Sequence, residues 1–135
     1  MRPGGIEGKL KLTGRVIYRG RAEGKALVST QPLSFYGGIS PVTGKVIERG
    51  HELFGESVKG RVLAFPYGKG STVGSYVLYR LRKNGRAPSA IINEECETIV
   101  AVGAIISEIP CVDKIDLSRI RPDVQLRIDG ATLRF

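Results

Sequence analysis

The spacing of apolar residues divides the chain into a strand-rich first half and a second half in which strands and helices alternate. Apolar and polar positions alternate over residues 10–29, and we expect two short strands joined by a turn there. A long loop over residues 29–44 follows, and residues 45–48 are expected to form another short strand. The continuous apolar run over residues 61–65, which ends at Pro66, is typical of a buried strand.

In the second half, helical and strand patterns follow one another closely. Residues 71–83 carry apolar side chains at helical spacing and end in a basic last turn, which predicts a helix. Residues 97–107 are apolar nearly all round and predict a buried helix. Short strands are expected at 89–93 and 110–112, and a closing hairpin at 124–135. The pattern therefore indicates a mixed α/β fold with a β-rich half, a βαβαβ half and a final hairpin.

The length and composition indicate one globular domain. The chain has 135 residues, 41% of them hydrophobic, and we expect a flexible lead-in over residues 1–8 and a single domain over residues 9–135. It contains neither an apolar run long enough to cross a membrane nor an apolar signal core, so we expect a protein that is neither integral to a membrane nor secreted. The net charge of +8 favours an anionic partner, which can be nucleic acid, a phosphorylated or carboxylated small molecule, or an acidic protein surface.

The cysteines and the single histidine supply few metal ligands. Cys96 and Cys111 do not form a disulfide framework, which favours a reducing cytoplasm, and we expect both to be small buried hydrophobes. Two thiols cannot hold a metal cluster, and His51 has no second ligand beside it, so we expect a structural His51 and no metal site. The chain has only four amide side chains and one Met, a composition typical of thermophiles.

The most informative segment is the Gly-rich turn over residues 65–72 (FPYGKGST). A buried strand, a turn containing Gly68, Lys69 and Gly70, and a helix beginning at Ser71 would point backbone N–H groups and the positive helix end at one place, which makes an anion site. The segment is not a Walker A loop, because Gly70 separates Lys69 from Ser71. The alternative is that Ser71 is only a helix N-cap.

The loop over residues 29–44 (STQPLSFYGGISPVTG) is long for a compact domain, and such loops are usually functional or disordered. We expect an ordered loop, because Leu33, Phe35, Tyr36 and Ile39 favour burial. A packed surface loop without a function is the alternative. The basic residues are scattered and few aromatic residues accompany them, which disfavours a nucleic-acid stacking platform.

Residues 29–44, His51, residues 60–63 (GRVL) and residues 68–71 (GKGS) together resemble the small subunit of aconitase X-type dehydratases. The resemblance covers most of the chain from Gly14 onward. It implies the swivelling β/β/α fold of the mobile domain of the aconitase superfamily, here a separate polypeptide.

The resemblance also implies a role for particular residues. Ser71 matches the serine that accepts the proton, and its position at a helix start would stabilise the alkoxide. Lys69 would add positive charge, and other residues of the two segments are candidates for binding the substrate or closing the site. This candidate substrate-binding set is Gly68, Lys69, Gly70, Thr72, Ser34, Gly37 and Gly38.

The resemblance implies that this chain is the small subunit of a heterodimeric cytoplasmic hydro-lyase. The chain would be active only together with a large aconitase-like partner. That partner would hold a [4Fe-4S] cluster, a Lewis acid for the leaving hydroxyl. The expected reaction converts (R)-5-phosphomevalonate to trans-anhydromevalonate 5-phosphate in an archaeal mevalonate route to isoprenoids. Alternatives are a subunit acting on hydroxyproline or another hydroxy acid, a lid without a catalytic residue, and a small basic nucleic-acid-binding module, which would bind in a salt-sensitive manner.

Overall fold

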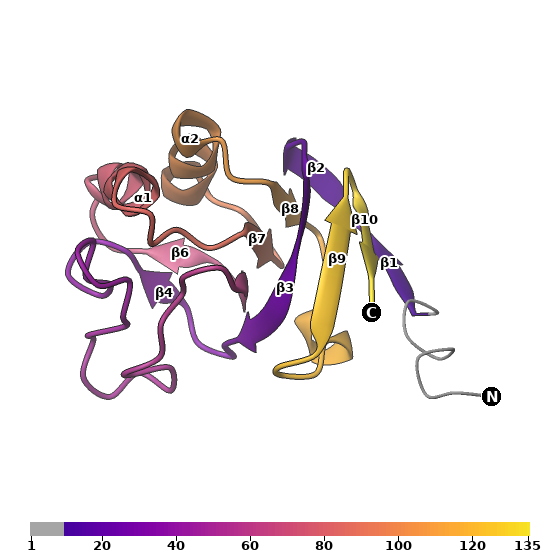
Figure 1. Cartoon of the computed structure of the whole chain (residues 1–135), viewed down its shortest axis with the longest axis horizontal. Helices are drawn as coiled ribbons and strands as arrows, with labels where there is room; N and C mark the ends of the chain where they lie inside the picture. Colours follow the sequence, from indigo (N-terminus) through magenta and orange to yellow (C-terminus); the bar gives the residue numbers. More distant parts are fainter. Residues whose placement is uncertain (1–9) are drawn as a thin grey trace.

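The computed structural model describes residues 10–135, so the lead-in predicted over residues 1–8 lies outside the described part (Figure 1). The strands in chain order are β1 (Lys11–Thr13), β2 (Arg15–Tyr18), β3 (Arg21–Val28), β4 (Leu33–Ser34), β5 (Val62–Phe65), β6 (Gly68–Lys69), β7 (Ala90–Asn93), β8 (Cys111–Asp113), β9 (Gln125–Asp129) and β10 (Thr132–Arg134). The helices are α1 (Gly74–Lys83), α2 (Thr98–Ser107) and the short 3-10 helix η2 (Leu117–Arg119). The predicted mixed α/β fold is confirmed.

Eight of these strands form one mixed sheet in the order β1-β10-β9-β3-β5-β7-β8-β2. The centre is parallel, because β3, β5, β7 and β8 run in one direction, and the remaining pairs are antiparallel. The two edge strands, β1 and β2, are consecutive in the chain and only Gly14 separates them. One extended segment therefore joins both edges and closes the sheet on itself. A Cβ atom at Gly14 would lie 2.2 Å from the Asp113 carbonyl oxygen, so this close approach requires glycine.

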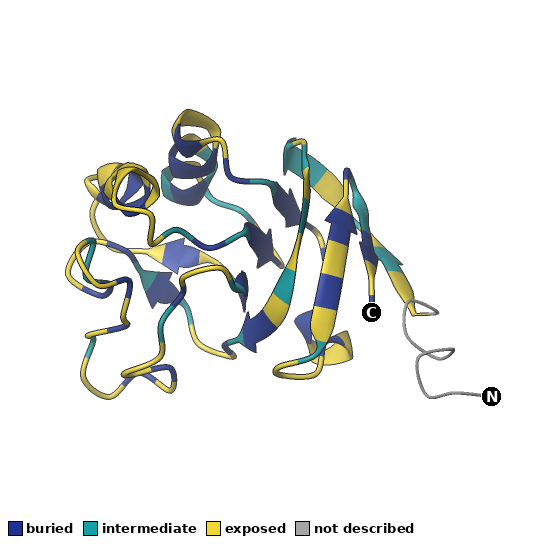
Figure 2. Ribbon diagram, in the orientation of Figure 1, coloured by how far each residue is buried: buried dark blue, intermediate teal, exposed yellow. Residues whose placement is uncertain are grey.

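Successive side chains of the parallel strands enter two separate cores. On β5, Val62 and Ala64 pack inside the closed sheet, whereas Leu63 and Phe65 pack toward the helices and the long loop. This alternation is the period of two expected for a strand that is buried on both faces. Figure 2 shows the buried residues continuing from the strands into the inner faces of α1 and α2. The segments that follow β3 and β5 therefore rest on a packed base at the carboxyl edge of the parallel strands.

Some predicted elements differ from the structure. Residues 45–48 do not form a strand, because only isolated bridges occur there, from Lys45 to Ser57 and from Val46 to Ile39. Residues 10–29 form three strands rather than two. The first helix begins at Gly74 instead of Ser71.

The second helix begins at Thr98 with Glu97 as its N-cap, one residue later than predicted. The side chain of Glu97 accepts hydrogen bonds from the backbone N–H groups of Ile99 and Val100. The helix is not buried all round as predicted, because part of its apolar surface faces outward. The exposed residues of this surface are Val102, Ile105 and Ile106.

Candidate functional site

The two segments singled out in the sequence meet in space. In a two-stranded parallel sheet, β4 of the long loop pairs with β6 of the Gly-rich turn, with Leu33 opposite Gly68 and Ser34 opposite Lys69. Leu33 is fully buried, and its N–H donates to the carbonyl of Tyr67. The short pairing therefore holds both segments together at the carboxyl edge of the central parallel strands.

Gly70 places Ser71 at the end of the small sheet. Its φ is +94°, in the region that favours glycine. Ser71 is exposed, and its Oγ accepts a hydrogen bond of 3.1 Å from the N–H of Val73. Among the described residues, the N–H groups of Ser71 and Thr72 donate no hydrogen bond. Ser71 therefore lies outside the first turn of α1 but beside free N–H donors and the positive end of the helix.

A shallow depression of about 400 Å³ lies beside this loop. It brings together five of the candidate residues, and its full lining is Ser34, Tyr36, Gly37, Gly38, Glu48, Lys69 and Gly70. The ammonium group of Lys69 lies 3.4 Å from a carboxylate oxygen of Glu48, and the Lys69 side chain is half exposed. Lys69 is thus the one cation of the depression. Its ion pair with Glu48 is partly exposed and weak, so the ammonium group remains available to an anion.

Three candidate residues are not part of this lining: Ser71, which directly follows Gly70, and two members of the substrate-binding set, Gly68 and Thr72. Gly68 is buried beneath it, and a Cβ atom there would lie 2.5 Å from both Glu97 Oε1 and a Val100 methyl carbon. Gly68 therefore serves packing, because no side chain fits at this position. Thr72 lines a different cavity, a groove between α1 and α2.

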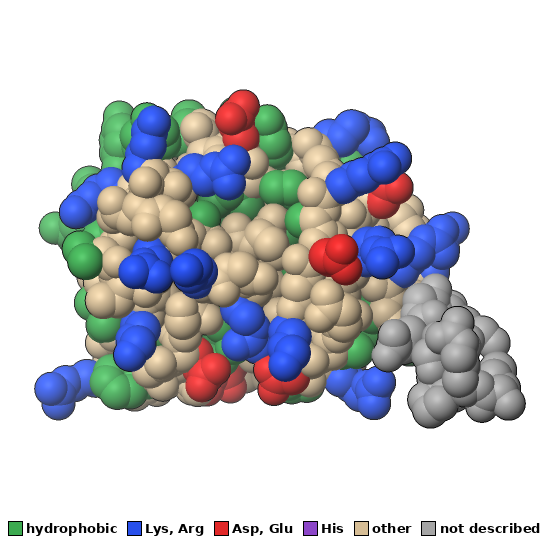
Figure 3. Space-filling model, in the orientation of Figure 1, with side chains coloured by type: hydrophobic (Ala, Val, Ile, Leu, Met, Phe, Trp, Pro, Cys, Tyr) green, Lys and Arg blue, Asp and Glu red, His purple; other side chains and the backbone are tan. Residues whose placement is uncertain are grey.

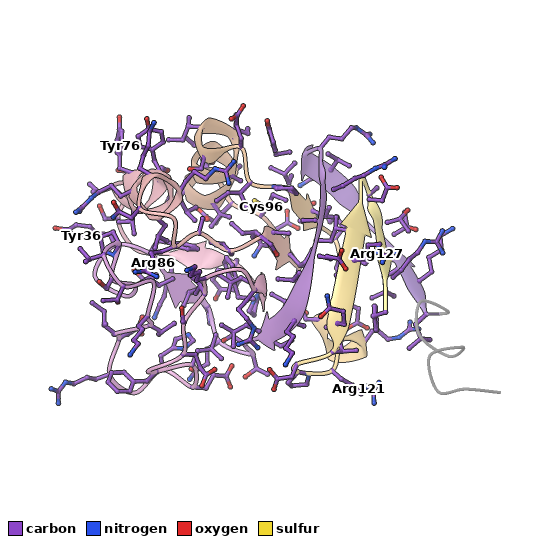
Figure 4. The ribbon with its side chains drawn as sticks, in the orientation of Figure 1. Tyr36, Tyr76, Arg86, Cys96, Arg121 and Arg127 are labelled. Carbon is purple, nitrogen blue, oxygen red and sulfur yellow. The ribbon has the colours of Figure 1, made fainter. Side chains whose placement is uncertain are left out.

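The groove between the helices is the second concave surface near Ser71. It encloses about 370 Å³ and is lined by Thr72, Val73, Ser75, Tyr76, Thr98, Ile99, Val102 and Ile106. Tyr76, on the helix that the sequence predicted, is 66% exposed. Tyr36, expected to be buried, is 56% exposed. In Figure 4 both tyrosines project outward at the end of the molecule that carries α1.

Two acidic residues near the long loop, Glu48 and Glu52, were not identified as site candidates from the sequence. Glu48 lines the depression, but a single carboxylate in an expected strand carries no signal of its own. Glu52 binds the start of the loop, accepting hydrogen bonds from the hydroxyls of Ser29 and Thr30 and from the backbone N–H groups of Thr30 and Gln31. Burial by itself raises the pKa of Glu52, but these hydrogen bonds lower it below its ordinary value.

His51 has the structural role that the sequence indicated. Its ring is buried, its Nε2 lies 3.1 Å from the carbonyl oxygen of Pro32, and its Nδ1 accepts from the N–H of Leu53. Because Nδ1 accepts a hydrogen bond, the ring proton lies on Nε2, which donates to the Pro32 carbonyl. The ring thus links the segment at Pro32 to the segment at Leu53. Within residues 10–135, no three His, Cys, Asp or Glu side chains gather as a possible metal site. No helix in this part of the chain is long and apolar enough to cross a membrane.

The closed mixed sheet, its two helices and the Gly-rich loop at the carboxyl edge define a swivelling β/β/α domain. The family model described as the aconitase X swivel domain matches residues 11–134. The chain belongs to this family.

Curated relatives and solved structures agree with this assignment. The chain is 63% identical over 109 residues, 81% of this chain and 76% of the relative, to a protein of Methanosarcina acetivorans named phosphomevalonate dehydratase small subunit. A protein of Thermococcus kodakarensis with the same name is 54% identical and is matched over 90% of this chain and 91% of its own.

Two solved structures share the fold. The crystal structure of aconitase X from Thermococcus kodakaraensis in its holo-form has a TM-score of 0.91 and 51% identity, with 93% of this chain and 97% of that chain covered. The solution NMR structure of a UPF0107 protein has a TM-score of 0.84 and 50% identity, covering 92% and 97% respectively. The resemblance inferred from the sequence motifs is therefore confirmed.

Proposed function

We propose that this chain is the small subunit of a dehydratase that converts (R)-5-phosphomevalonate to trans-anhydromevalonate 5-phosphate in the cytoplasm. The names of the curated relatives support the reaction. The observation that carries the proposal is the exposed Ser71 hydroxyl, which lies beside free N–H donors at the start of α1 and next to a depression with a lysine.

In this proposal Ser71 accepts the proton that leaves the substrate carbon. A serine hydroxyl is a poor base unless its deprotonated form is stabilised. The Val73 N–H donates to Oγ and the helix N-terminus supplies a positive field, and both effects favour the alkoxide over the alcohol. The hydroxyl is not buried within its own chain, so a substrate held by a partner can reach it.

The depression would bind an anionic group of the substrate. Lys69 is the only basic residue of its lining, and Gly38 packs its backbone directly against the Ser34 carbonyl, where a Cβ atom would lie 2.0 Å from the oxygen. At Gly37 a Cβ atom would meet nothing within 4 Å, so the backbone here borders open space. Ser34 donates its hydroxyl hydrogen to the Tyr36 carbonyl and thereby fixes the turn that forms the wall.

The partner in this proposal is a large aconitase-like subunit in a heterodimer. The name small subunit, which the curated relatives carry, implies a larger one. The groove between α1 and α2 is apolar and continuous in the chain with the Ser71 loop through Thr72 and Val73. A partner that covers Ser71 would therefore also cover the groove, and exposed apolar surface of this kind marks protein contacts. Figure 3 shows hydrophobic side chains gathered over the helical end of the molecule.

A [4Fe-4S] cluster belongs to the large subunit in this account, where it would polarise the leaving hydroxyl of the substrate. The described residues of the small subunit do not fit such a cluster. Its two cysteines are Cys111, which is buried in the core beside the sheet, and Cys96, which lies next to it. No step that involves this chain's residues passes through iron.

The test is anaerobic co-expression of the two subunits, followed by measurement of water loss from (R)-5-phosphomevalonate and from hydroxyproline. Turnover of the phosphorylated acid, absent from either subunit alone, supports the proposal. Turnover of hydroxyproline alone would assign the chain to another dehydratase of the group. Full activity of the large subunit by itself would mean that this chain is a lid without a catalytic residue. Salt-sensitive binding of DNA or RNA without turnover would mean that it is a nucleic-acid-binding module.

A further inference from the structure

The two cysteines of the chain lie side by side although 15 positions separate them. The Sγ atoms of Cys96, in the loop between β7 and α2, and Cys111, the first residue of β8, are 3.9 Å apart. Cys111 is buried and Cys96 is half-buried (Figure 4 labels Cys96). We propose that Cys96 and Cys111 form an intramolecular disulfide, a covalent modification that goes beyond the proposed function and does not depend on it.

The backbone on both sides of the pair is held in place by hydrogen bonds. The N–H of Lys114 donates to the Glu94 carbonyl, and that of Ile115 donates to the Asn93 carbonyl. The N–H of Cys96 itself donates to a carboxylate oxygen of Asp113 at 2.9 Å. These contacts fix the loop against the end of β8 and keep the two sulfur atoms facing each other, and a disulfide requires them to approach from 3.9 Å to about 2.0 Å.

The reaction is a thiol–disulfide exchange with a small-molecule disulfide as oxidant. The Cys96 thiolate, which is the more accessible, attacks one sulfur of the oxidant, and a mixed disulfide forms while one small thiolate leaves. The Cys111 thiolate then attacks the Cys96 sulfur, and the second small thiolate leaves. The two protein thiols are oxidised and lose their protons to the two released thiolates, so one disulfide of the oxidant becomes two thiols.

The second step is the slow one. The hydrogen-bond contact with Cys96, together with burial, raises the pKa of Cys111 well above its ordinary value. In the finished bond an external thiol reaches the Cys96 sulfur, and the Cys111 thiolate is then a poor leaving group because its pKa is raised. The inferred disulfide is therefore slow to form and slow to reduce, as expected of a structural bond rather than a rapid switch.

The bond would stiffen the loop that supports the candidate site. The N–H groups of Glu94 and Glu95 both donate to the carbonyl of Pro66, directly after β5, and Glu97 packs against Gly68. Closing a loop of this size restricts the unfolded chain and is worth a rise in melting temperature of roughly 10 °C. A gain of this kind agrees with the thermophile-like composition, since intracellular proteins of hyperthermophiles are a group in which disulfides are common.

The test compares the full chain after incubation with oxidised glutathione and after reduction with dithiothreitol. We expect the oxidised chain to lose the mass of two hydrogen atoms, to yield a peptide pair joined at Cys96 and Cys111, and to melt roughly 10 °C higher than the reduced chain. Cys96→Ser is the matched control, because it keeps the buried Cys111; its melting temperature should be the same under both conditions.

Three results would overturn the proposal. One is glutathione that remains on Cys96 as a stable adduct, a second is a disulfide between two copies of the chain, and a third is a chain that keeps both thiols free. An internal disulfide that leaves the melting temperature unchanged would overturn its stabilising role. If Cys96→Ser misfolds, Cys96→Ala gives the same comparison without an added hydroxyl.

Discussion

The hydroxyl oxygen of Ser34 lies 2.7 Å from the position that a Cβ atom would occupy at Gly70. The two residues come from segments far apart in the sequence, and they meet because β4 and β6 pair. The turn that presents Ser71 is therefore packed directly on the wall of the depression. Two requirements make residue 70 a glycine: a positive φ and this close contact.

Gly70→Ala should lower both stability and activity. A non-glycine residue in the left-handed region costs about 1–2 kcal/mol, and the contact with Ser34 adds to this cost or displaces the Ser71 loop. Gly37→Ala is the matched control for the backbone strain, because Gly37 also has positive φ but nothing lies near its Cβ position. Thermal unfolding of both variants should show the larger loss for Gly70→Ala, and equal losses would contradict the packing argument.

Lys69→Gln should weaken substrate binding more than folding. Its pair with Glu48 is surface-exposed and contributes at most about 1 kcal/mol to stability. Loss of the one cation in the depression should raise KM for a phosphorylated acid about tenfold, equivalent to ~1.4 kcal/mol. Lys59→Gln removes one exposed charge elsewhere and should leave KM unchanged. Similar KM values for the two variants would contradict a role of Lys69 in anion binding.

Acid should destabilise the fold through Asp113. This fully buried carboxylate accepts two hydrogen bonds from Arg15 and one from the Cys96 N–H. Burial alone would raise the pKa of Asp113, but these partners hold it below its ordinary value. The carboxylate therefore stabilises the fold above the unfolded pKa near about 4, and this contribution disappears as pH falls through the lowered pKa.

Melting temperatures measured from pH 7 down to pH 3 check this prediction. Asp113→Asn should melt lower than the native chain at pH 7 and should lose less stability on acidification. The cost at neutral pH should be about 1–3 kcal/mol, because donors of Arg15 and Cys96 lose a charged acceptor. Parallel pH profiles for the two proteins would show that Asp113 does not carry the effect.

Val102→Asp should weaken assembly with the large subunit while the isolated chain stays folded. Val102 is exposed in the apolar groove, so the substitution costs little in the free chain and buries a charge in the proposed interface. Leu10→Asp is the control, because Leu10 is also exposed and directly precedes β1, which lies away from both helices in Figure 1. Co-purification should retain the partner with the control variant and lose it with Val102→Asp; equal retention would exclude the groove.

The sequence predicted the elements that a strong period defines. The alternating strands, the two helices of the βαβαβ half and the closing hairpin all appear near their expected positions, because each buries a regular face. Residues 45–48 satisfied the same pattern but formed only isolated bridges, since their neighbours supply no continuous partner strand. Apolar residues on α2 were expected to be buried, yet Val102 and Ile106 line an open groove. Periodicity cannot distinguish core from a surface that a partner covers.

The candidate site was predicted in part. Both segments were chosen from their glycines and length, but their contact depends on the two-residue pairing of Leu33–Ser34 with Gly68–Lys69, which is too short to leave a pattern. The sequence also allowed Ser71 to be a simple N-cap. In the structure Val73 is the residue before the helix, yet Ser71 Oγ accepts from the Val73 N–H as a capping side chain does. The structure therefore agrees with both roles of Ser71, and the Ser71→Ala variant separates them.

The central claim is that the Ser71 hydroxyl accepts the proton during dehydration. The most direct measurement is the turnover number of the co-expressed complex with Ser71→Ala, beside Ser118→Ala, which removes an exposed hydroxyl from η2. Both variants should assemble with the large subunit and melt within a few degrees of the native chain. The account predicts a loss of about 10²–10⁴-fold in kcat for Ser71→Ala only. An assembled Ser71→Ala complex with native turnover would contradict it.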